Sequence, residues 1–256
     1  MYFDLWHFCQ EACTIKVSTM TKVDELSIFF PFYNEEKNIE AVVEEALPVA
    51  KKLAKKWEII MVDDGSKDKT AAVAKKLLKL DPNLRFVQNV PNKGYGGALK
   101  AGLEAAKYDL VIFADGDRQF KFSEAEKLIA KVNGVDMVIG YRKKRNDHPV
   151  RHMLMMLLKI WDYLFFGFHF KDIDCGFKLF TRKALNALLP LSSDGAMITT
   201  EILAKAKKAH LKIAQVEVNH YPRTFGESTG GNIRVIVRAV RESFQLWKQL
   251  NYGKPA

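Results

Sequence analysis

Cysteine is scarce in this chain of 256 residues, which contains three: Cys9, Cys13 and Cys175. The set is odd in number and lacks the spacing of a zinc site or a redox motif. This pattern favours a reducing compartment such as the cytosol over a disulfide framework. We interpret all three residues as inert small hydrophobes.

Long apolar runs are also missing. No segment reaches the roughly 20 uninterrupted apolar residues that a membrane span needs. The nearest, residues 153–170, is broken by Lys159 and Asp162. We expect this stretch to lie in a membrane interface without crossing it, with packing in the core as the alternative. The first 25 residues lack the pattern of a secretory leader, and we treat 1–24 as an N-terminal extension.

Negative charge is in deficit, since 30 Asp and Glu face 40 Lys and Arg, a formal net charge of +10. Basic clusters beside amphipathic segments favour anionic partners such as phosphates and acidic lipid headgroups. A solvated basic face is the alternative for residues 142–145. No zinc-finger, RNA-recognition or helix-turn-helix signature is present, so we expect no nucleic acid partner. The clusters contain Arg142, Lys143, Lys144, Arg145 and Arg151, and later Arg223, Arg234, Arg238 and Arg241.

Strand-length apolar runs alternate with helix-period segments through the first 140 residues. This alternation predicts βαβ units, an α/β fold and a mainly parallel sheet in one globular domain. Ligands bind such sheets beyond the carboxyl ends of the strands. We expect strands at Leu26–Phe32, Glu58–Val62, Leu84–Gln88, Leu110–Ala114 and Met137–Gly140, and helices at Glu36–Lys56, Lys69–Lys79, Gly96–Lys107 and Ser123–Lys131.

The segment Asp115-Gly116-Asp117, followed by Gln119, comes directly after the apolar run 110–114. A buried strand that ends at two carboxylates presents them together at one edge of the sheet. Carboxylate and amide oxygens suit Mg²⁺ or Mn²⁺, whose other ligands are typically water and substrate phosphates. Taken alone, an acidic pair at a strand end is more often a solvated turn. The other loops decide between these two interpretations.

Polar loops also follow the first three strands, and turn and cap chemistry explains each one taken singly. Gly94 and Gly96 permit a close approach of backbone to ligand, but Leu99 stands where a dinucleotide motif requires its third glycine. No Walker lysine follows. These observations disfavour the dinucleotide-binding fold and the P-loop enzymes. The loops contain Pro31-Phe32-Tyr33-Asn34-Glu35, Val62-Asp63-Asp64-Gly65-Ser66-Lys67-Asp68-Lys69-Thr70 and Asn92-Lys93-Gly94-Tyr95-Gly96-Gly97-Ala98.

In this order and at this spacing, the three loops and the acidic segment resemble the family 2 glycosyltransferases of GT-A fold. The resemblance implies a Rossmann-like, mixed, mainly parallel sheet flanked by helices. It also implies a nucleoside diphosphate sugar as donor and Mg²⁺ or Mn²⁺ as cofactor, with the cation offsetting charge on the departing nucleotide. The implied metal ligands are Asp115, Asp117 and Gln119, and the implied nucleotide-sugar residues are Pro31, Tyr33, Glu35, Asp63, Asp64, Lys93, Gly94, Asp115 and Gly116.

The second half narrows the resemblance. Asp172-Ile173-Asp174-Cys175-Gly176-Phe177-Lys178 and His220-Tyr221-Pro222-Arg223-Thr224-Phe225-Gly226-Glu227-Ser228 are similar to motifs of the polyprenyl-phosphate sugar synthases, the group of dolichol-phosphate mannose synthase. The likeness covers about residues 26–230. It implies a polyprenyl or dolichyl phosphate acceptor, whose charged oxygen needs no general base. By the motif match we assign the acceptor phosphate to Arg142, Arg151, Arg223 and Ser228, and the catalytic roles to Asp117, Arg223 and Arg142.

Two alternatives stay open. Other family 2 enzymes keep an acidic base near the position of Glu201, so transfer to a sugar hydroxyl in surface polysaccharide synthesis is one. With a phosphate acceptor, Glu201 would instead be structural or bind the donor sugar. The other alternative is a non-catalytic module that binds a nucleotide sugar or a lipid headgroup. GDP-mannose and UDP-glucose are the leading donors.

We divide the chain into an extension (1–24), a GT-A domain (25–230) and a C-terminal basic amphipathic helix (231–256). The stretch 153–170 and the segment 233–250 are candidate amphipathic interfacial helices, and core packing is equally compatible with 233–250. Some members of the group carry membrane-spanning helices after the catalytic domain. The sequence given ends at Ala256 without such helices. We therefore expect peripheral binding to the cytosolic face of a membrane, or attachment through a separate membrane protein.

Overall fold

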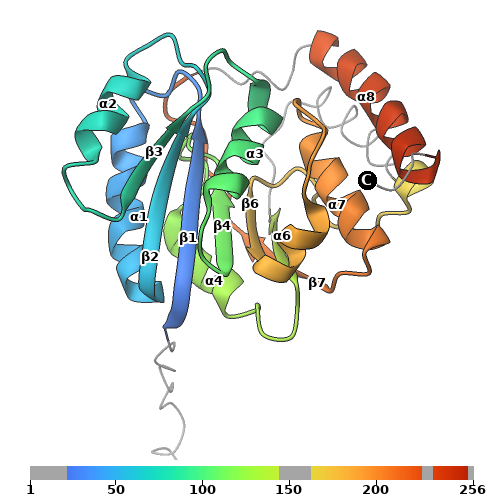
Figure 1. Cartoon of the computed structure of the whole chain (residues 1–256), viewed down its shortest axis with the longest axis horizontal. Coiled ribbons are helices and arrows are strands. Elements are labelled where there is room, and N and C mark those ends of the chain that lie inside the picture. Colours follow the sequence, from blue (N-terminus) through green and yellow to red (C-terminus); the bar gives the residue numbers. More distant parts are fainter. Residues whose placement is uncertain (1–21, 144–162, 227–232, 253–256) are drawn as a thin grey trace, which may run out of the picture.

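A computed structural model of the chain describes residues 22–143, 163–226 and 233–252. These residues form a seven-stranded sheet with helices on both faces (Figure 1). The strand order is β3-β2-β1-β4-β6-β5-β7. The strands are β1 (Val23–Phe32), β2 (Ala54–Asp63), β3 (Leu84–Gln88), β4 (Leu110–Ala114), β5 (Met137–Arg142), β6 (Phe177–Thr181) and β7 (Ile213–Val218).

The sheet is mixed and mainly parallel, as expected from the sequence. Strands β1 to β4 pair in parallel, and so do β5 and β7, whereas β6 runs antiparallel to both β4 and β5. Central strands such as β1 are buried on both faces, which explains their continuous apolar sequences. The parallel arrangement brings the loops after β1, β2, β3 and β4 to one edge.

Two apolar cores fill the space between the sheet and its helices. Ile28 and Phe30 of β1 face the core under α1, α2 and α4, whereas Phe29 faces the core under α3, α6 and α7. The C-terminal helix α8 packs against α7 (Figure 1). The helices are α1 (Ile39–Leu53), α2 (Thr70–Leu77), α3 (Gly94–Ala105), α4 (Ala125–Ile129), α6 (Arg182–Leu188), α7 (Ile198–Lys208) and α8 (Ile233–Tyr252), with a 3-10 helix η1 (Phe122–Glu124) before α4.

Several predicted boundaries were wrong. The helix expected over Glu36–Lys56 ends at Leu53, and β2 begins at once with Ala54, because this part of β2 already pairs with β1. The helix expected over Ser123–Lys131 is a short 3-10 turn followed by α4. The sequence analysis assigned no strands at β6 and β7. The first strand begins at Val23, three residues before the expected start at Leu26.

The amphipathic segments are described in part. Most of 153–170 lies outside the described residues, and α8 confirms a helix in the C-terminal segment. None of the helices in the described ranges combines the length and the apolar character required to span a bilayer. In α8, Leu246 is buried while Phe244 and Tyr252 are exposed. The helix therefore packs on the domain and also presents aromatic side chains outward.

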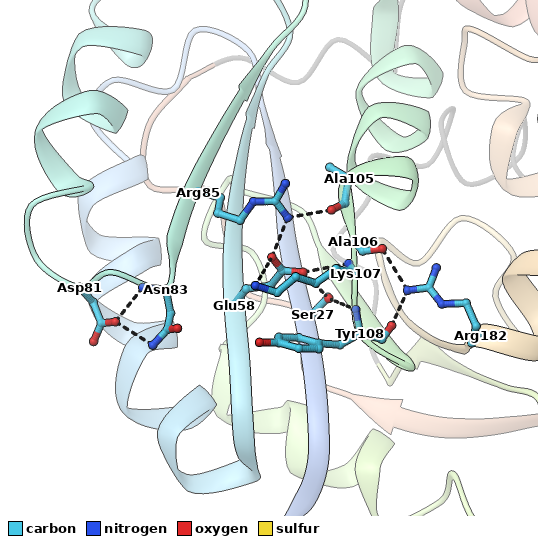
Figure 2. A network of polar contacts seen from close by, with 10 residues as sticks. All are labelled: Ser27, Glu58, Asp81, Asn83, Arg85, Ala105, Ala106, Lys107, Tyr108 and Arg182. Atoms are coloured by element: carbon cyan, nitrogen blue, oxygen red, sulfur yellow. Dashed lines mark hydrogen bonds and ion pairs between the residues drawn. The ribbon is translucent and has the colours of Figure 1, made fainter.

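A buried polar network holds the C-terminal end of α3 against the sheet (Figure 2). Glu58 of β2 is fully buried and accepts hydrogen bonds from Ser27 Oγ at 2.6 Å, the Lys107 backbone N at 3.0 Å and Arg85 Nη1 at 2.7 Å. The same Arg85 nitrogen donates to the Ala105 carbonyl at 2.8 Å. Cations are favourable at this end of a helix, where the last carbonyls lack intrahelical partners.

A second arginine completes the arrangement. Arg182, at the start of α6, donates to the carbonyls of Ala106 at 3.0 Å and Tyr108 at 2.5 Å (Figure 2). The network therefore joins β1, β2, β3 and α6 to one end of α3. The other end of α3 points toward the edge where the polar loops gather.

We predict that Glu58→Gln destabilises the fold in a pH-dependent way. Burial acts to raise the pKa of Glu58, but hydrogen bonds from Ser27, Lys107 and Arg85 outweigh it and lower the pKa. The ionised carboxylate thus stabilises the fold at neutral pH, and this contribution is lost as the pH falls through the lowered pKa. Urea denaturation should show a loss of about 1–3 kcal/mol at pH 7. The difference between the two proteins should shrink below about pH 4, and a difference independent of pH would contradict the assignment.

Candidate active site

An open pocket of about 420 Å³ lies at the carboxyl ends of the parallel strands. Its walls come from the loops after β1, β2, β3 and β4, with one side chain from the segment after β7. Most of the expected nucleotide-sugar residues line it, together with Phe32, Asn92, Tyr95 and Ala98, which were not expected. The expected residues in the lining are Pro31, Tyr33, Glu35, Asp64, Gly94, Asp115, Gly116, Asp117 and Arg223.

Asp115 is held in place by two segments distant in sequence. Its backbone N–H donates to the Gly176 carbonyl at 3.0 Å, and Tyr95 Oη donates to Asp115 Oδ1 at 2.9 Å. A Cβ atom at position 176 would lie 1.9 Å from Asp115 Oδ2. Only glycine leaves room for the carboxylate, so the segment before β6 shapes the acidic site.

The two carboxylates of the acidic segment repel each other. Burial raises the pKa of Asp115 to about 7, and the negative charge of Asp117 adds to the shift, while Tyr95 and Lys178 oppose it. Asp117 lines the pocket and accepts a hydrogen bond from the Gln119 backbone N–H at 3.0 Å. Two carboxylates that gain from a nearby positive charge fit a divalent cation.

The ligand set at this site would be shared with a substrate. Within the described residues, no group of three or more His, Cys, Asp or Glu side chains is placed to hold a metal. Asp115 and Asp117 thus fit a cation that takes its remaining ligands from water or phosphate oxygens. The Gln119 side chain donates from Nε2 to the Tyr221 carbonyl at 3.2 Å, which fixes its amide beside the acidic segment.

The buried side chain of Lys178 lies near Asp115. Lys178 of β6 is fully buried and donates to the carbonyls of Ile173, at 3.2 Å, and Cys175. Burial lowers the pKa of this ammonium group. The nearby carboxylates, Asp115 among them, oppose this shift, and the ammonium group in turn lowers the pKa of Asp115. Its bonds to the two carbonyls also fix the turn that carries Gly176. Burial raises the pKa of the Cys175 thiol to about 12, which fits the expected inert role.

Arg142 is a buried ion pair and not a solvated charge. Its Nε and Nη2 atoms donate to Asp172 at 2.6 and 2.8 Å, and its side chain is 10% exposed. Burial opposes the charge, but the bonds to Asp172 hold the pKa of Arg142 above its usual value. Arg142 is not among the residues that line the pocket.

Arg223 crosses from the segment after β7 to the loop after β1. Its Nη2 atom donates to Glu35 Oε1, and its Nε donates to the Phe225 carbonyl at 2.9 Å. Glu35 Oε2 accepts from Asn38 Nδ2 at 2.5 Å. Burial raises the pKa of Glu35, although Asn38 and Arg223 oppose the rise. Both members of this pair line the pocket.

Other expected residues shape the loops. Asp64 Oδ1 accepts from Asn89 Nδ2 at 2.8 Å and from the Lys93 backbone N–H at 3.0 Å. Asn92 Nδ2 donates to the Asp64 carbonyl at 2.6 Å, which ties the loop after β3 to the loop after β2. Asp63 accepts from the Ser66 backbone N–H and Gln88 Nε2. Asp63 and Lys93 thus support the pocket from behind its lining.

Glu201 lies in α7, fully buried and not in the pocket lining. Its carboxylate accepts from the backbone N–H groups of Ser192 and Ser193 and pairs with Lys205 at 2.9 Å. Burial alone would raise the pKa of Glu201, but these bonds lower it. The remaining expected residues, Arg151 and Ser228, lie outside the described residues.

Six residues of the site were not predicted from the sequence: Phe32, Asn92, Tyr95, Ala98, Gly176 and Lys178. Tyr95 stands between two glycines of the loop after β3, and a bulky residue there signals a specific contact. Gly176 and Lys178 belong to a motif that the resemblance identified, but the motif alone gives them no role. Their placement near Asp115 depends on the antiparallel pairing of β6 with β4.

Comparison with known proteins identifies the family of the chain. The glycosyl transferase family 2 model matches residues 27–189. The dolichyl-phosphate beta-glucosyltransferase of Dictyostelium discoideum is 34% identical over 217 residues, 76% of this chain and 65% of that protein. The human protein of the same name is 32% identical over 218 residues, 76% of this chain and 67% of that protein. The chain spans about two thirds of the length of these relatives.

A bacterial relative and a solved structure extend the comparison. The undecaprenyl-phosphate 4-deoxy-4-formamido-L-arabinose transferase of Shewanella sediminis is 30% identical, over 84% of this chain and 64% of that protein. Glucosyl-3-phosphoglycerate synthase from Mycobacterium tuberculosis, in complex with Mn²⁺, UDP and glucosyl-3-phosphoglycerate, matches with a TM-score of 0.70. The aligned region covers 91% of this chain and 81% of the synthase chain, with 21% sequence identity. This likeness confirms the GT-A fold.

We predict that Gly176→Ala abolishes cation-dependent nucleotide binding while leaving the chain folded. The new methyl group would occupy the position of the Asp115 carboxylate and displace it from the pocket. Isothermal titration of UDP with Mn²⁺ should show no saturable binding. Gly195→Ala is the matched control, because its Cβ would meet only the end of the Glu242 side chain, at 3.0 Å. Equal affinity in Gly176→Ala and Gly195→Ala would contradict the role of Asp115.

Proposed function

The chain belongs to glycosyl transferase family 2, and from this premise we propose that it transfers one sugar, with inversion, from a nucleoside diphosphate sugar to a polyprenyl phosphate. The observation that carries the proposal is the pair Asp115 and Asp117, which faces a pocket at the carboxyl ends of the parallel strands. A divalent cation bound there would supply positive charge to the diphosphate leaving group.

The nucleoside half of the donor would occupy the loops after β1 and β2. Tyr33 is 42% exposed at the pocket wall and offers a ring face to a base, while Asp64 offers a carboxylate to a ring N–H or a hydroxyl. Gly94, the first residue of α3, has no side chain and so lets the donor come close to the N-terminal backbone of this helix. Between the two leading donors we propose UDP-glucose. The names of the eukaryotic relatives and the UDP in the solved structure support this choice over GDP-mannose.

The acceptor phosphate would be held by Arg223. A phosphate monoester is charged at neutral pH, so its oxygen can attack the anomeric carbon opposite the diphosphate without a general base. Arg223 lines the pocket, and a bidentate phosphate would replace its contact with Glu35. Arg151 and Ser228 stay in the proposed acceptor set. We assign Arg142, held by Asp172, to stabilising the charge of Asp115 from behind.

The contacts of Glu201 favour a phosphate acceptor over a sugar hydroxyl. A general base must be within hydrogen-bond reach of the proton that it removes. Both carboxylate oxygens of Glu201 instead accept from the 192–193 backbone, away from the pocket lining. The non-catalytic alternative is disfavoured by Asp115, Asp117 and Arg223 facing one pocket together.

We also propose that the protein works at the cytosolic surface of a membrane. Aromatic side chains of α8 and of residues 163–166 form a partly exposed cluster, in which the rings of Phe165 and Trp247 lie 5.7 Å apart. Tyr163, Leu164 and Phe244 are exposed, and Lys248 lies over the Phe244 ring. Such an aromatic and basic surface suits the interface of a bilayer with anionic lipids. A separate membrane protein is the alternative anchor.

We predict transfer of labelled glucose from UDP-glucose into an organic-extractable product when a short polyprenyl phosphate and Mn²⁺ are supplied. Because Asp117 faces the pocket as a proposed ligand of the cation, Asp117→Asn should lower the rate at least about 100-fold, the cost typical of losing one charge-stabilising group. The assay should include GDP-mannose as competing donor and a free sugar, which offers hydroxyl groups, as competing acceptor. Lys131→Ala, at an exposed position outside the pocket lining, is the control for general effects of substitution.

The outcomes separate the alternatives. Label in the organic phase from GDP-mannose alone would replace the donor but keep the acceptor. Binding of a donor with metal, without labelling of the lipid, would contradict the lipid-phosphate acceptor and favour a hydroxyl acceptor or a binding module. Full activity of Asp117→Asn would contradict the catalytic site itself.

A further inference from the structure

Glu201 holds a loop and not a substrate. Its Oε1 atom accepts from Ser192 N at 2.8 Å and Ser192 Oγ at 3.0 Å, and its Oε2 atom accepts from Ser193 N at 2.7 Å. Lys205, one turn later in α7, pairs with the same carboxylate and also donates to the Pro190 carbonyl. The carboxylate thus anchors residues 190–193 to α7 from the interior.

The anchored loop forms a backbone seat for the first turn of α3. The Gly96 N–H donates to the Asp194 carbonyl at 2.9 Å, and Lys100 pairs with the Asp194 side chain at 2.5 Å. A Cβ atom at Gly96 would lie 2.4 Å from the Ser193 carbonyl, and one at Gly94 would lie 2.6 Å from the Asp194 carbonyl. The two backbones touch with no space for a side chain.

This turn of α3 is also a wall of the pocket. Gly94, Tyr95 and Ala98 line it, and Tyr95 donates its hydroxyl to Asp115. Displacement of the loop would therefore move the α3 terminus and, through Tyr95, the carboxylate of the acidic segment. A continuous line of direct contacts joins Glu201 to the donor site.

We propose that Glu201 is a positioning residue, which sets the nucleotide-sugar pocket by fixing the seat of the α3 N-terminus. The binding part of this inference rests on the proposed function, whereas the mechanical link between Glu201 and α3 does not. The negative charge and both oxygens are needed, because a glutamine offers one acceptor oxygen and an NH₂ group that only donates. In Glu201→Gln, a backbone N–H of the loop would lose its partner.

The test compares Glu201→Gln with Glu58→Gln. Both glutamates are fully buried and both accept backbone and side-chain hydrogen bonds, but Glu58 holds the opposite end of α3 (Figure 2). Hydrogen exchange of the amides at 96–99 measures, without any ligand, how firmly the first turn of α3 is held against the backbone of residues 193–194. Titration with UDP and Mn²⁺ reports the pocket, and the kinetic constants for UDP-glucose separate donor binding from chemistry.

In Glu201→Gln we expect faster exchange at 96–99, about tenfold weaker UDP binding and a donor KM raised to a similar extent, with kcat changed less than about threefold. Glu58→Gln should lower stability but leave these constants unchanged. Unaltered exchange at 96–99 in Glu201→Gln would overturn the inference. So would unaltered UDP affinity, or a kcat reduced by orders of magnitude at constant KM, which would identify a general base. Failure of the wild-type protein to bind any nucleotide would contradict the proposed function, and the exchange result would still decide the link.

Discussion

The site depends on keeping a half-buried carboxylate, Asp115, beside a second carboxylate, Asp117. A charge removed from water is costly unless other charges compensate for it. Here the compensation comes from Tyr95 on one side and from Lys178 and Arg142 behind, while Asp117 adds repulsion. The balance favours a cation beside the two carboxylates. The strand β6, inserted antiparallel beside β4, brings Gly176 and Lys178 to Asp115 and makes the arrangement possible.

Helix α3 connects the scaffold to this site. Glu58, Arg85 and Arg182 hold its C-terminal end in the network of Figure 2, and the loop anchored by Glu201 meets its N-terminal end. Buried polar groups that are fully paired specify one arrangement, whereas a partly paired set would be costly. One wall of the pocket is formed by the N-terminal turn of α3, which the Glu201 loop contacts, whereas the Glu58 network holds the end of the helix outside the pocket lining. The Arg223 and Glu35 pair is a contact that a bound phosphate can replace.

Much of the donor side could be predicted from the sequence, because its residues directly follow strands that apolar runs identify. Asp64, Asp115 and Asp117 came together for that reason. The remainder depends on contacts between distant segments. Arg142 and Asp172 are 30 residues apart, and no local pattern announces their pairing. Glu201 was weighed as a base from its place in a motif, but its partners in the 192–193 loop are visible only in the fold. The strands β6 and β7 were not predicted, because β6 runs antiparallel between β4 and β5 and breaks the βαβ alternation that identifies the earlier strands.

The most direct test of the account is a titration of Mn²⁺ followed by electron paramagnetic resonance, with and without UDP, in the wild-type protein and in Asp117→Asn. The account predicts that UDP tightens Mn²⁺ binding to the wild-type protein, because the diphosphate and the carboxylates of Asp115 and Asp117 share the cation. It predicts that the substitution removes this coupling. Equal Mn²⁺ affinity in both proteins, with or without UDP, would contradict the claim that this acidic pair forms the donor site.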